Sequence, residues 1–138
     1  MKLAITGGTG FLGSHCAAEA FKKGYSVRLL VRNQKKAYEA LEMHNLNPKD
    51  FEIVQADLED AESLYLGIKG VDFLLHAAAV FSLSPLDAKT MLKVNPSSTE
   101  ALLSAAVEHG VQQTVYVSTM GVFAPINGND IDENSATS

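Results

Sequence analysis

The spacing of the apolar residues alternates regularly between the period of a strand and the period of a helix. Strands are expected at residues 2–6, 26–31, 51–54, 71–76 and 113–118, with helices between them at 10–23, 35–46, 61–68 and 87–109. The fourth strand is apolar nearly throughout, which is typical of strands covered by helices on both faces. The pattern predicts a doubly wound, three-layer α/β domain with a parallel sheet of at least five strands in the order 3-2-1-4-5.

Length and charge limit the kinds of protein this chain can be. Its 138 residues suffice for one core, so residues 1–138 are expected to form one domain. With 11 basic and 16 acidic residues it carries a net charge of -5, which argues against nucleic acid as the main partner. A single cysteine and no zinc-type spacing predict no disulfide and no metal site. No apolar run reaches about 18 residues, so no membrane span is expected and the cytoplasm is the expected compartment.

A glycine-rich string, Thr6-Gly7-Gly8-Thr9-Gly10-Phe11-Leu12-Gly13, lies between the first strand and the first helix. Glycines permit a tight turn and let the backbone approach a pyrophosphate, whose charge suits a helix N-terminus. The string fits two glycine patterns, Gly7-x-x-Gly10-x-x-Gly13 and Gly8-x-Gly10-x-x-Gly13. The alternative interpretation is a glycine-rich turn that binds no ligand. Its place at the start of a βαβ unit favours dinucleotide binding.

The second strand ends in Val31-Arg32-Asn33. An acidic residue at this place would hold the ribose 2′-hydroxyl of NAD, whereas a guanidinium is the partner expected for a 2′-phosphate. Lys35 and Lys36 stand nearby and add positive charge. A solvated arginine after a strand is the alternative, and NADP is the predicted cofactor.

Further motifs extend this pattern along the chain. They are Ala56-Asp57-Leu58, His76-Ala77-Ala78-Ala79, Val94-Asn95 and Tyr116-Val117-Ser118-Thr119. Together with the glycine string and Arg32 they resemble the short-chain dehydrogenase/reductase superfamily, in its extended branch of NAD-dependent epimerases and dehydratases. Within that branch the chain is most similar to dihydroflavonol-reductase-like proteins. The resemblance covers essentially all 138 residues and implies a Rossmann-type fold.

The resemblance also implies roles for individual residues. Those expected to bind the cofactor are Gly7, Thr9, Gly10, Phe11, Leu12, Gly13, Arg32, Asp57, Leu58, His76, Ala77, Ala78 and Ser118. Asp57 and Leu58 would contact adenine, although Asp57 could equally cap the helix that follows. Thr119 would be the catalytic hydroxyl, whereas the alternative for Ser118 and Thr119 is hydrogen bonding to backbone.

The Tyr-x-x-x-Lys pair of the family is expected a few tens of residues after Thr119, beyond Ser138, and so outside this sequence. The literal match Tyr65 to Lys69 lies on a helix that runs toward the amino edge of the sheet, away from the edge where ligands bind. The chain is therefore taken as an N-terminal portion whose substrate domain follows. Asn95 matches an asparagine of the family, but Pro96 is expected to kink or break the helix there.

The implied function is that of an NADP-dependent oxidoreductase, which transfers hydride to or from a small carbonyl or alcohol substrate. A homodimer is expected only for a longer parent protein. Two alternatives stay open: an NmrA-like NADP-sensing regulator without catalysis, and a nucleotide-sugar epimerase or dehydratase. Arg32 argues against the epimerase, because those enzymes usually carry an acid after the second strand.

Overall fold

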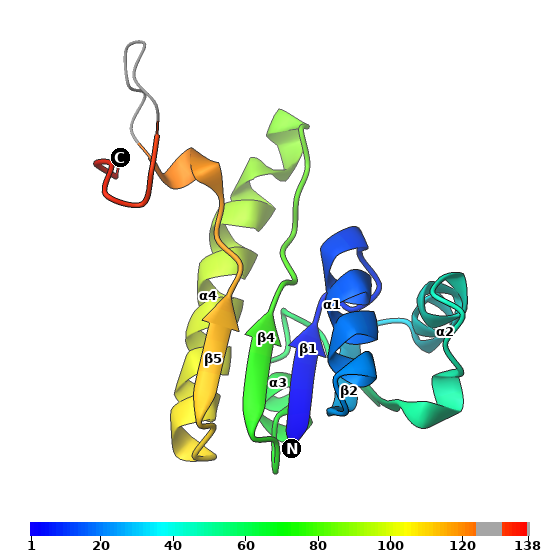
Figure 1. Ribbon diagram of the computed structural model, residues 1–138. Helices are drawn as coiled ribbons and strands as arrows, with labels where there is room; N and C mark the ends of the chain where they lie inside the picture. Colours follow the sequence, from blue (N-terminus) through cyan, green and yellow to red (C-terminus); the bar gives the residue numbers. More distant parts are fainter. Residues whose placement is uncertain (124–130, 138) are drawn as a thin grey trace.

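The computed structural model describes residues 1–123 and 131–137, and Figure 1 draws the remaining residues in grey. The predicted domain of residues 1–138 therefore includes a short segment outside the described residues. Five strands form one sheet: β1 (Lys2–Thr6), β2 (Ser26–Val31), β3 (Glu52–Gln55), β4 (Phe73–His76) and β5 (Gln113–Tyr116). All neighbours are parallel and the order is β3-β2-β1-β4-β5, which confirms the predicted topology.

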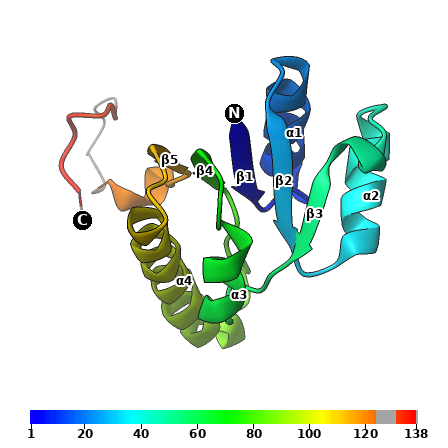
Figure 2. The same cartoon turned by 90° about the horizontal axis from the view of Figure 1, so that it is seen from below.

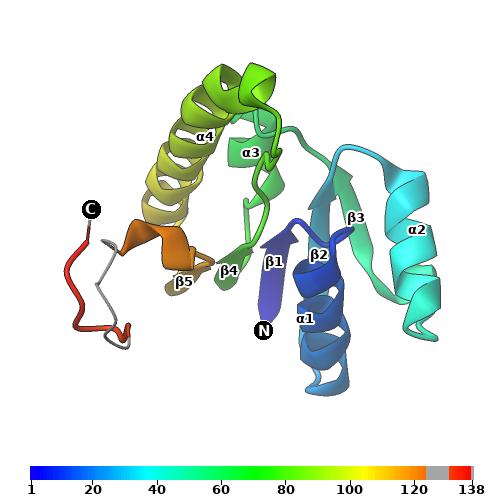
Figure 3. The ribbon, with the colours of Figure 1, turned by 90° about the horizontal axis from the view of Figure 1, so that it is seen from above.

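Within the described residues, four α-helices cover this sheet: α1 (Phe11–Lys22), α2 (Gln34–Met43), α3 (Ala61–Gly67) and α4 (Ala88–Glu108). Helices α1 and α2 lie on one face, and α3 and α4 lie on the other (Figures 2 and 3). Within the described residues, no helix is both long enough and apolar enough to cross a membrane.

Each face of the sheet has its own apolar core. Ala4 and Leu74 pack with Leu102 in the core under α3 and α4. Ile5, the neighbour of Ala4, faces the other way and packs with Leu29 under α1 and α2. Successive side chains of a strand point to opposite faces, so a strand between two helical layers must be apolar at every position. This is why the central strands read as continuous apolar runs.

Helix α1 buries only part of the stripe that apolar spacing predicts. Leu12, Cys16 and Ala20 recur every four residues, which favours them as core residues; Ala20 is buried, but Leu12 is 47% exposed and Cys16 is only partly buried. Gly13 and Ala17 are buried instead. Because α1 lies close against the sheet, small residues form the contact and the larger apolar side chains are pushed to its rim.

Helix α4 continues without a break through Pro96, so the expected break is wrong. Hydroxyl groups just after the proline donate to carbonyls of the preceding turn: Ser97 to Lys93 at 2.8 Å, and Thr99 to Asn95 at 2.9 Å. A helix of 21 residues that is packed along the sheet tolerates the loss of one backbone donor.

Candidate functional site

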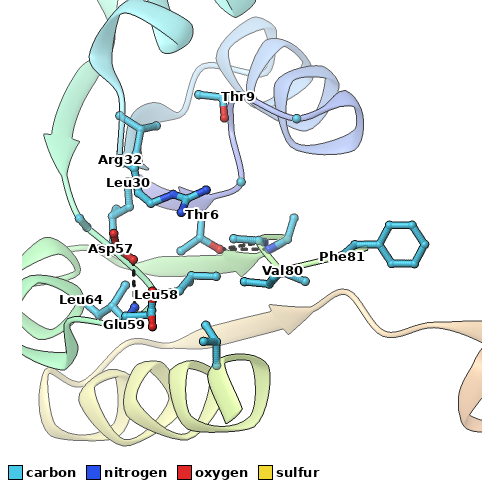
Figure 4. A pocket seen from close by; sticks show the side chains of 18 of the residues that line it. Thr6, Thr9, Leu30, Arg32, Asp57, Leu58, Glu59, Leu64, Val80 and Phe81 are labelled. Carbon is cyan, nitrogen blue, oxygen red and sulfur yellow. Dashed lines mark hydrogen bonds between the residues drawn. The ribbon is translucent and has the colours of Figure 1, made fainter. Parts of the chain in front are cut away.

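A cavity of about 470 Å³ opens at the carboxyl edge of the sheet, between the segments that follow β1, β2, β3 and β4. Figure 4 shows Thr9, Arg32, Asp57 and Val80 around it. Its volume is in the range of small-molecule sites. Eight of the residues predicted to bind the cofactor line it: Gly7, Thr9, Gly10, Arg32, Asp57, Leu58, Ala77 and Ala78.

The other predicted residues do not line this cavity. Phe11 and Leu12 begin α1, and the Phe11 side chain is 85% exposed, so only the backbone of this turn faces the glycine loop. Ser118 and Thr119 are exposed beyond the end of β5. The Thr119 hydroxyl oxygen accepts a hydrogen bond from the Gly121 amide at 3.2 Å, and it caps a short turn. Their roles remain predictions.

Two glycines of the loop are required by packing alone. Gly7 has a φ of +76°, and a Cβ there would lie 2.8 Å from the carbonyl carbon of Ala77. A Cβ on Gly13 would overlap the carbonyl oxygen of Gly7. The loop thus holds the segment after β4 and the start of α1 at backbone contact distance.

Gly10 is different, because its conformation does not demand glycine and a Cβ there would make a tight contact rather than an overlap. Its φ of −89° and ψ of 172° are open to any residue. A Cβ would meet only the Gly7 carbonyl oxygen, at 3.3 Å. Gly10 is also the N-cap residue of α1, where it supplies no side-chain acceptor. The amides of the first turn of α1 are therefore left without a capping group beside the cavity.

The second wall of the cavity carries charged side chains. Arg32 follows β2 and is exposed, while Asp57 and Glu59 follow β3. One oxygen of Asp57 accepts from the Glu59 amide at 3.0 Å, drawn as a dashed line in Figure 4. The residue that caps α3 is Asp60, which accepts from the Glu62 and Ser63 amides. Asp57 itself is thus not the cap of this helix.

The third wall is the segment 77–80, which follows β4. The Thr6 hydroxyl oxygen accepts hydrogen bonds from the amides of Ala77 and Ala78, both at 3.2 Å (Figure 4). From α4, the Asn95 side chain bonds both backbone groups of Val80, accepting from its amide at 2.8 Å and donating to its carbonyl at 3.0 Å. Sequence reasoning set Asn95 aside because of Pro96, although the Val94-Asn95 motif was the signal for it.

Sequence reasoning also missed several cavity residues. These are Leu30, Val31, Ala56, Glu59, Leu64, Val80, Phe81, Thr90 and Val94, whereas Ala79 belongs to the predicted motif that begins at His76. Most continue a segment already singled out, and Thr90 and Val94 share one face of α4 at a spacing of four residues.

His76 is buried and its side chain does not line the cavity. Its Nδ1 lies 2.7 Å from the Thr6 hydroxyl, and its Nε2 lies 3.1 Å from the Thr99 hydroxyl. Desolvation by burial lowers the pKa of the ring below the ordinary value of 6.5. A neutral ring is expected at physiological pH.

The Tyr65–Lys69 match lies away from the cavity. The Tyr65 ring packs on His109, at the carboxyl end of α4, with ring centroids 4.3 Å apart. The Lys69 carbonyl accepts from Arg28 at 2.8 Å. This end of α4 leads into the start of β5, so the pair lies at the amino edge of the sheet. No group of three or more residues suited to a metal ion occurs in the described part of the chain.

Comparison with known proteins gives relatives along the whole described chain. It is 36% identical over 124 residues to a farnesyl-dihydroquinoline-oxide ketoreductase of Stigmatella aurantiaca, covering 90% of this chain and 35% of that protein. A Synechocystis protein, provisionally named dihydroflavonol 4-reductase, is 33% identical over 116 residues, which are 84% of this chain and 32% of that one. The chain thus spans about a third of the length of these curated relatives.

Among solved structures, the chain resembles a UDP-glucose 4-epimerase of Stenotrophomonas maltophila determined with bound NAD. The TM-score is 0.85 at 26% identity, over 100% of this chain and 43% of that one. The chain thus shares the fold of a protein that was solved with NAD bound. Residues 4–137 match the pattern of one family along almost the entire sequence, and the chain belongs to the 3-beta hydroxysteroid dehydrogenase/isomerase family.

Proposed function

We propose that this chain is the dinucleotide-binding part of an NADP-dependent oxidoreductase, which acts on a small carbonyl or alcohol substrate. The observation that carries the proposal is that Arg32 and the glycine loop line one cavity. A pyrophosphate against the first turn of α1 and a phosphate against Arg32 would then belong to a single ligand. The names of the ketoreductase and reductase relatives agree with this reaction class.

The residues present fit such a ligand. Gly10 lines the cavity without a side chain, and the first turn of α1 contains no acidic residue. The uncapped amides and the positive end of the helix therefore suit a pyrophosphate. The exposed Arg32 guanidinium offers the planar donor pair that a 2′-phosphate accepts.

The remaining walls would recognise the neutral parts of the ligand. Leu58 and Leu64 give an apolar surface for a base, and Asp57 beside them has a carboxylate to accept from an exocyclic amine. When bound, the nicotinamide would supply the hydride. The chain's own part is to hold and orient the dinucleotide, with Thr119 proposed to orient the substrate oxygen.

A nucleotide-sugar epimerase or dehydratase is the second candidate, favoured by the likeness to the solved epimerase with NAD. An NAD-using enzyme gains nothing from a guanidinium at the 2′ position, so the two candidates differ in cofactor preference. They can therefore be separated by binding alone, without knowledge of the substrate.

Calorimetric titration with NADP and with NAD tests the proposal. The wild-type chain is expected to bind NADP about 10- to 100-fold more tightly, because charge-assisted hydrogen bonds are worth about 1.5–3 kcal/mol. Arg32→Ala is expected to remove this preference, whereas Arg32→Lys keeps the charge and loses only part of it. Lys22→Ala removes a remote cation and serves as the control. Equal affinities in the wild type, or an unchanged preference in Arg32→Ala, would overturn the assignment.

A further inference from the structure

A row of polar groups runs behind the cavity, from the buried Thr6 on β1 through the buried His76 on β4 to the half-buried Thr99 on α4. Three contacts link them: Thr6 Oγ1 to His76 Nδ1 at 2.7 Å, His76 Nε2 to Thr99 Oγ1 at 3.1 Å, and Thr99 Oγ1 to the Asn95 carbonyl at 2.9 Å. At one end of the row, Thr6 accepts from the amides of Ala77 and Ala78. At the other end, the Asn95 side chain bonds Val80.

The direction of each bond follows from counting donors and acceptors. The Thr6 oxygen already accepts from two backbone amides, Ala77 and Ala78. Amides can only donate, so both lone pairs of this hydroxyl are used and its single proton is left for His76 Nδ1. The imidazole must then be an acceptor at Nδ1.

The bonds of Thr99, at the opposite end of the row, independently show which nitrogen of His76 carries the proton. The Thr99 hydroxyl donates its only proton to the Asn95 carbonyl. It can therefore only accept from His76, whose proton must be on Nε2. A protonated ring would point a second N–H at the Thr6 oxygen, which has no free lone pair. Burial also disfavours the protonated ring, because desolvation lowers the pKa of His76.

We propose that Thr6, His76, Thr99 and Asn95 form one directional hydrogen-bond chain that fastens the segment 77–80, and that Thr99 is a positioning residue of the cavity. Thr99 does not line the cavity itself. It acts through His76 and Thr6 on the amides of Ala77 and Ala78. Through its bond to the Asn95 backbone, it also steadies the side chain that holds Val80.

This arrangement satisfies backbone groups of a wall segment that belongs to no strand. Residues 77–80 follow the end of β4, and the amides of Ala77, Ala78 and Val80 donate to side chains. The hydrogen-bond chain provides these bonds from two elements, β1 and α4. Movement of α4 would thereby be passed to the cavity wall.

The first test is nuclear magnetic resonance of the free wild-type chain, which needs no ligand. The imidazole nitrogen shifts of His76 are expected to place the proton on Nε2, and the ring is expected to titrate below the ordinary value of 6.5. The Tyr116 ring of β5 packs against it, with ring centroids 5.5 Å apart, and the exposed Glu100 of α4 lines a groove with Thr99 and Tyr116. A proton on Nδ1 would overturn the proposal.

The second test compares Thr99→Val, which removes the hydroxyl at constant shape, with Thr99→Ser, which keeps it. Thr99→Val is expected to speed hydrogen exchange at the Ala78 and Val80 amides and to weaken NADP binding by about three- to tenfold, the effect of losing one or two buried hydrogen bonds. Thr99→Ser is expected to restore both. Ser97→Ala, on the same helix, removes a hydroxyl that has no link to His76 and is the control.

The affinity measurement rests on the proposed function, whereas the exchange measurement does not. A wild-type chain that shows the Nε2 tautomer and the Thr99-dependent exchange, but does not bind NADP, would leave the hydrogen-bond chain standing and remove the proposed function. Unchanged exchange and unchanged affinity in Thr99→Val would overturn the positioning role.

Discussion

Helices α1 and α3 both begin beside the cavity, yet they begin in different ways. Asp60 caps α3 by accepting from two amides, at 3.1 and 3.2 Å, and Glu62 adds an acidic group in the first turn. Helix α1 has Gly10 at the same position, with no capping bond and no acidic residue in its first turn. The first amides of α3 already have an acceptor within the chain, whereas those of α1 are left free to bind an anion.

The largest expected effect comes from the close turn on which the start of α1 depends. In Gly13→Ala the new methyl group would overlap the Gly7 carbonyl oxygen, which belongs to a rigid backbone segment. We expect a loss of about 3 kcal/mol or more in the free energy of unfolding. Urea unfolding followed by circular dichroism measures it. A loss below about 1 kcal/mol would mean that the turn can relax and is not the scaffold of the site.

The next prediction concerns Gly10→Asp, which gives α1 the kind of cap that Asp60 gives α3. Gly10→Asp supplies a capping carboxylate where the backbone already has the extended conformation of a cap. The new Cβ would lie 3.3 Å from the Gly7 carbonyl oxygen, and this tight contact opposes the gain of a cap, so the free energy of unfolding should change by less than about 1 kcal/mol. NADP affinity should fall about 100-fold or more, because the carboxylate occupies the amides and repels phosphate.

Calorimetry and urea unfolding on the same variant separate these two results. Gly10→Ser adds the cap without the charge, so an intermediate loss of affinity is expected. Unaltered NADP binding by a folded Gly10→Asp protein would show that the first turn of α1 does not hold the ligand.

The opposite change removes the cap of α3. Asp60→Ala leaves the amides of Glu62 and Ser63 without their acceptor, so the free energy of unfolding should fall by about 1 kcal/mol. NADP affinity should stay within about twofold, since Asp60 does not line the cavity. A large fall in affinity without loss of stability would show that the two helix starts share one role.

Much of this arrangement was predictable from sequence, because it depends on local signals. The glycine string, Arg32 and Asp57 each follow a strand, and parallel strands bring their carboxyl ends to one edge. The sheet order followed from the alternation of elements and the handedness of crossovers. Local pattern and chain topology were sufficient to predict two walls of the cavity: the glycine loop, and the wall that carries Arg32 and Asp57.

The third wall was not predictable in the same way, because it depends on contacts between elements far apart in sequence. His76 lies at the end of a strand, and only the fold shows that its ring turns inward between Thr6 and Thr99. Asn95 reaches Val80 from a helix that the proline rule would have broken. The buried face of α1 was predicted only in part, because a spacing of four apolar residues does not show how closely a helix lies against the sheet.

The most direct test of the account is the response of individual backbone amides to NADP, measured by nuclear magnetic resonance on the wild-type chain. If the first turn of α1 binds the pyrophosphate, the largest downfield amide proton shifts should appear among Phe11, Leu12 and Gly13. The Glu62 amide, already bonded to Asp60, should change much less. NADP binding that leaves residues 11–13 unshifted would contradict the central claim that the uncapped start of α1 is the phosphate site.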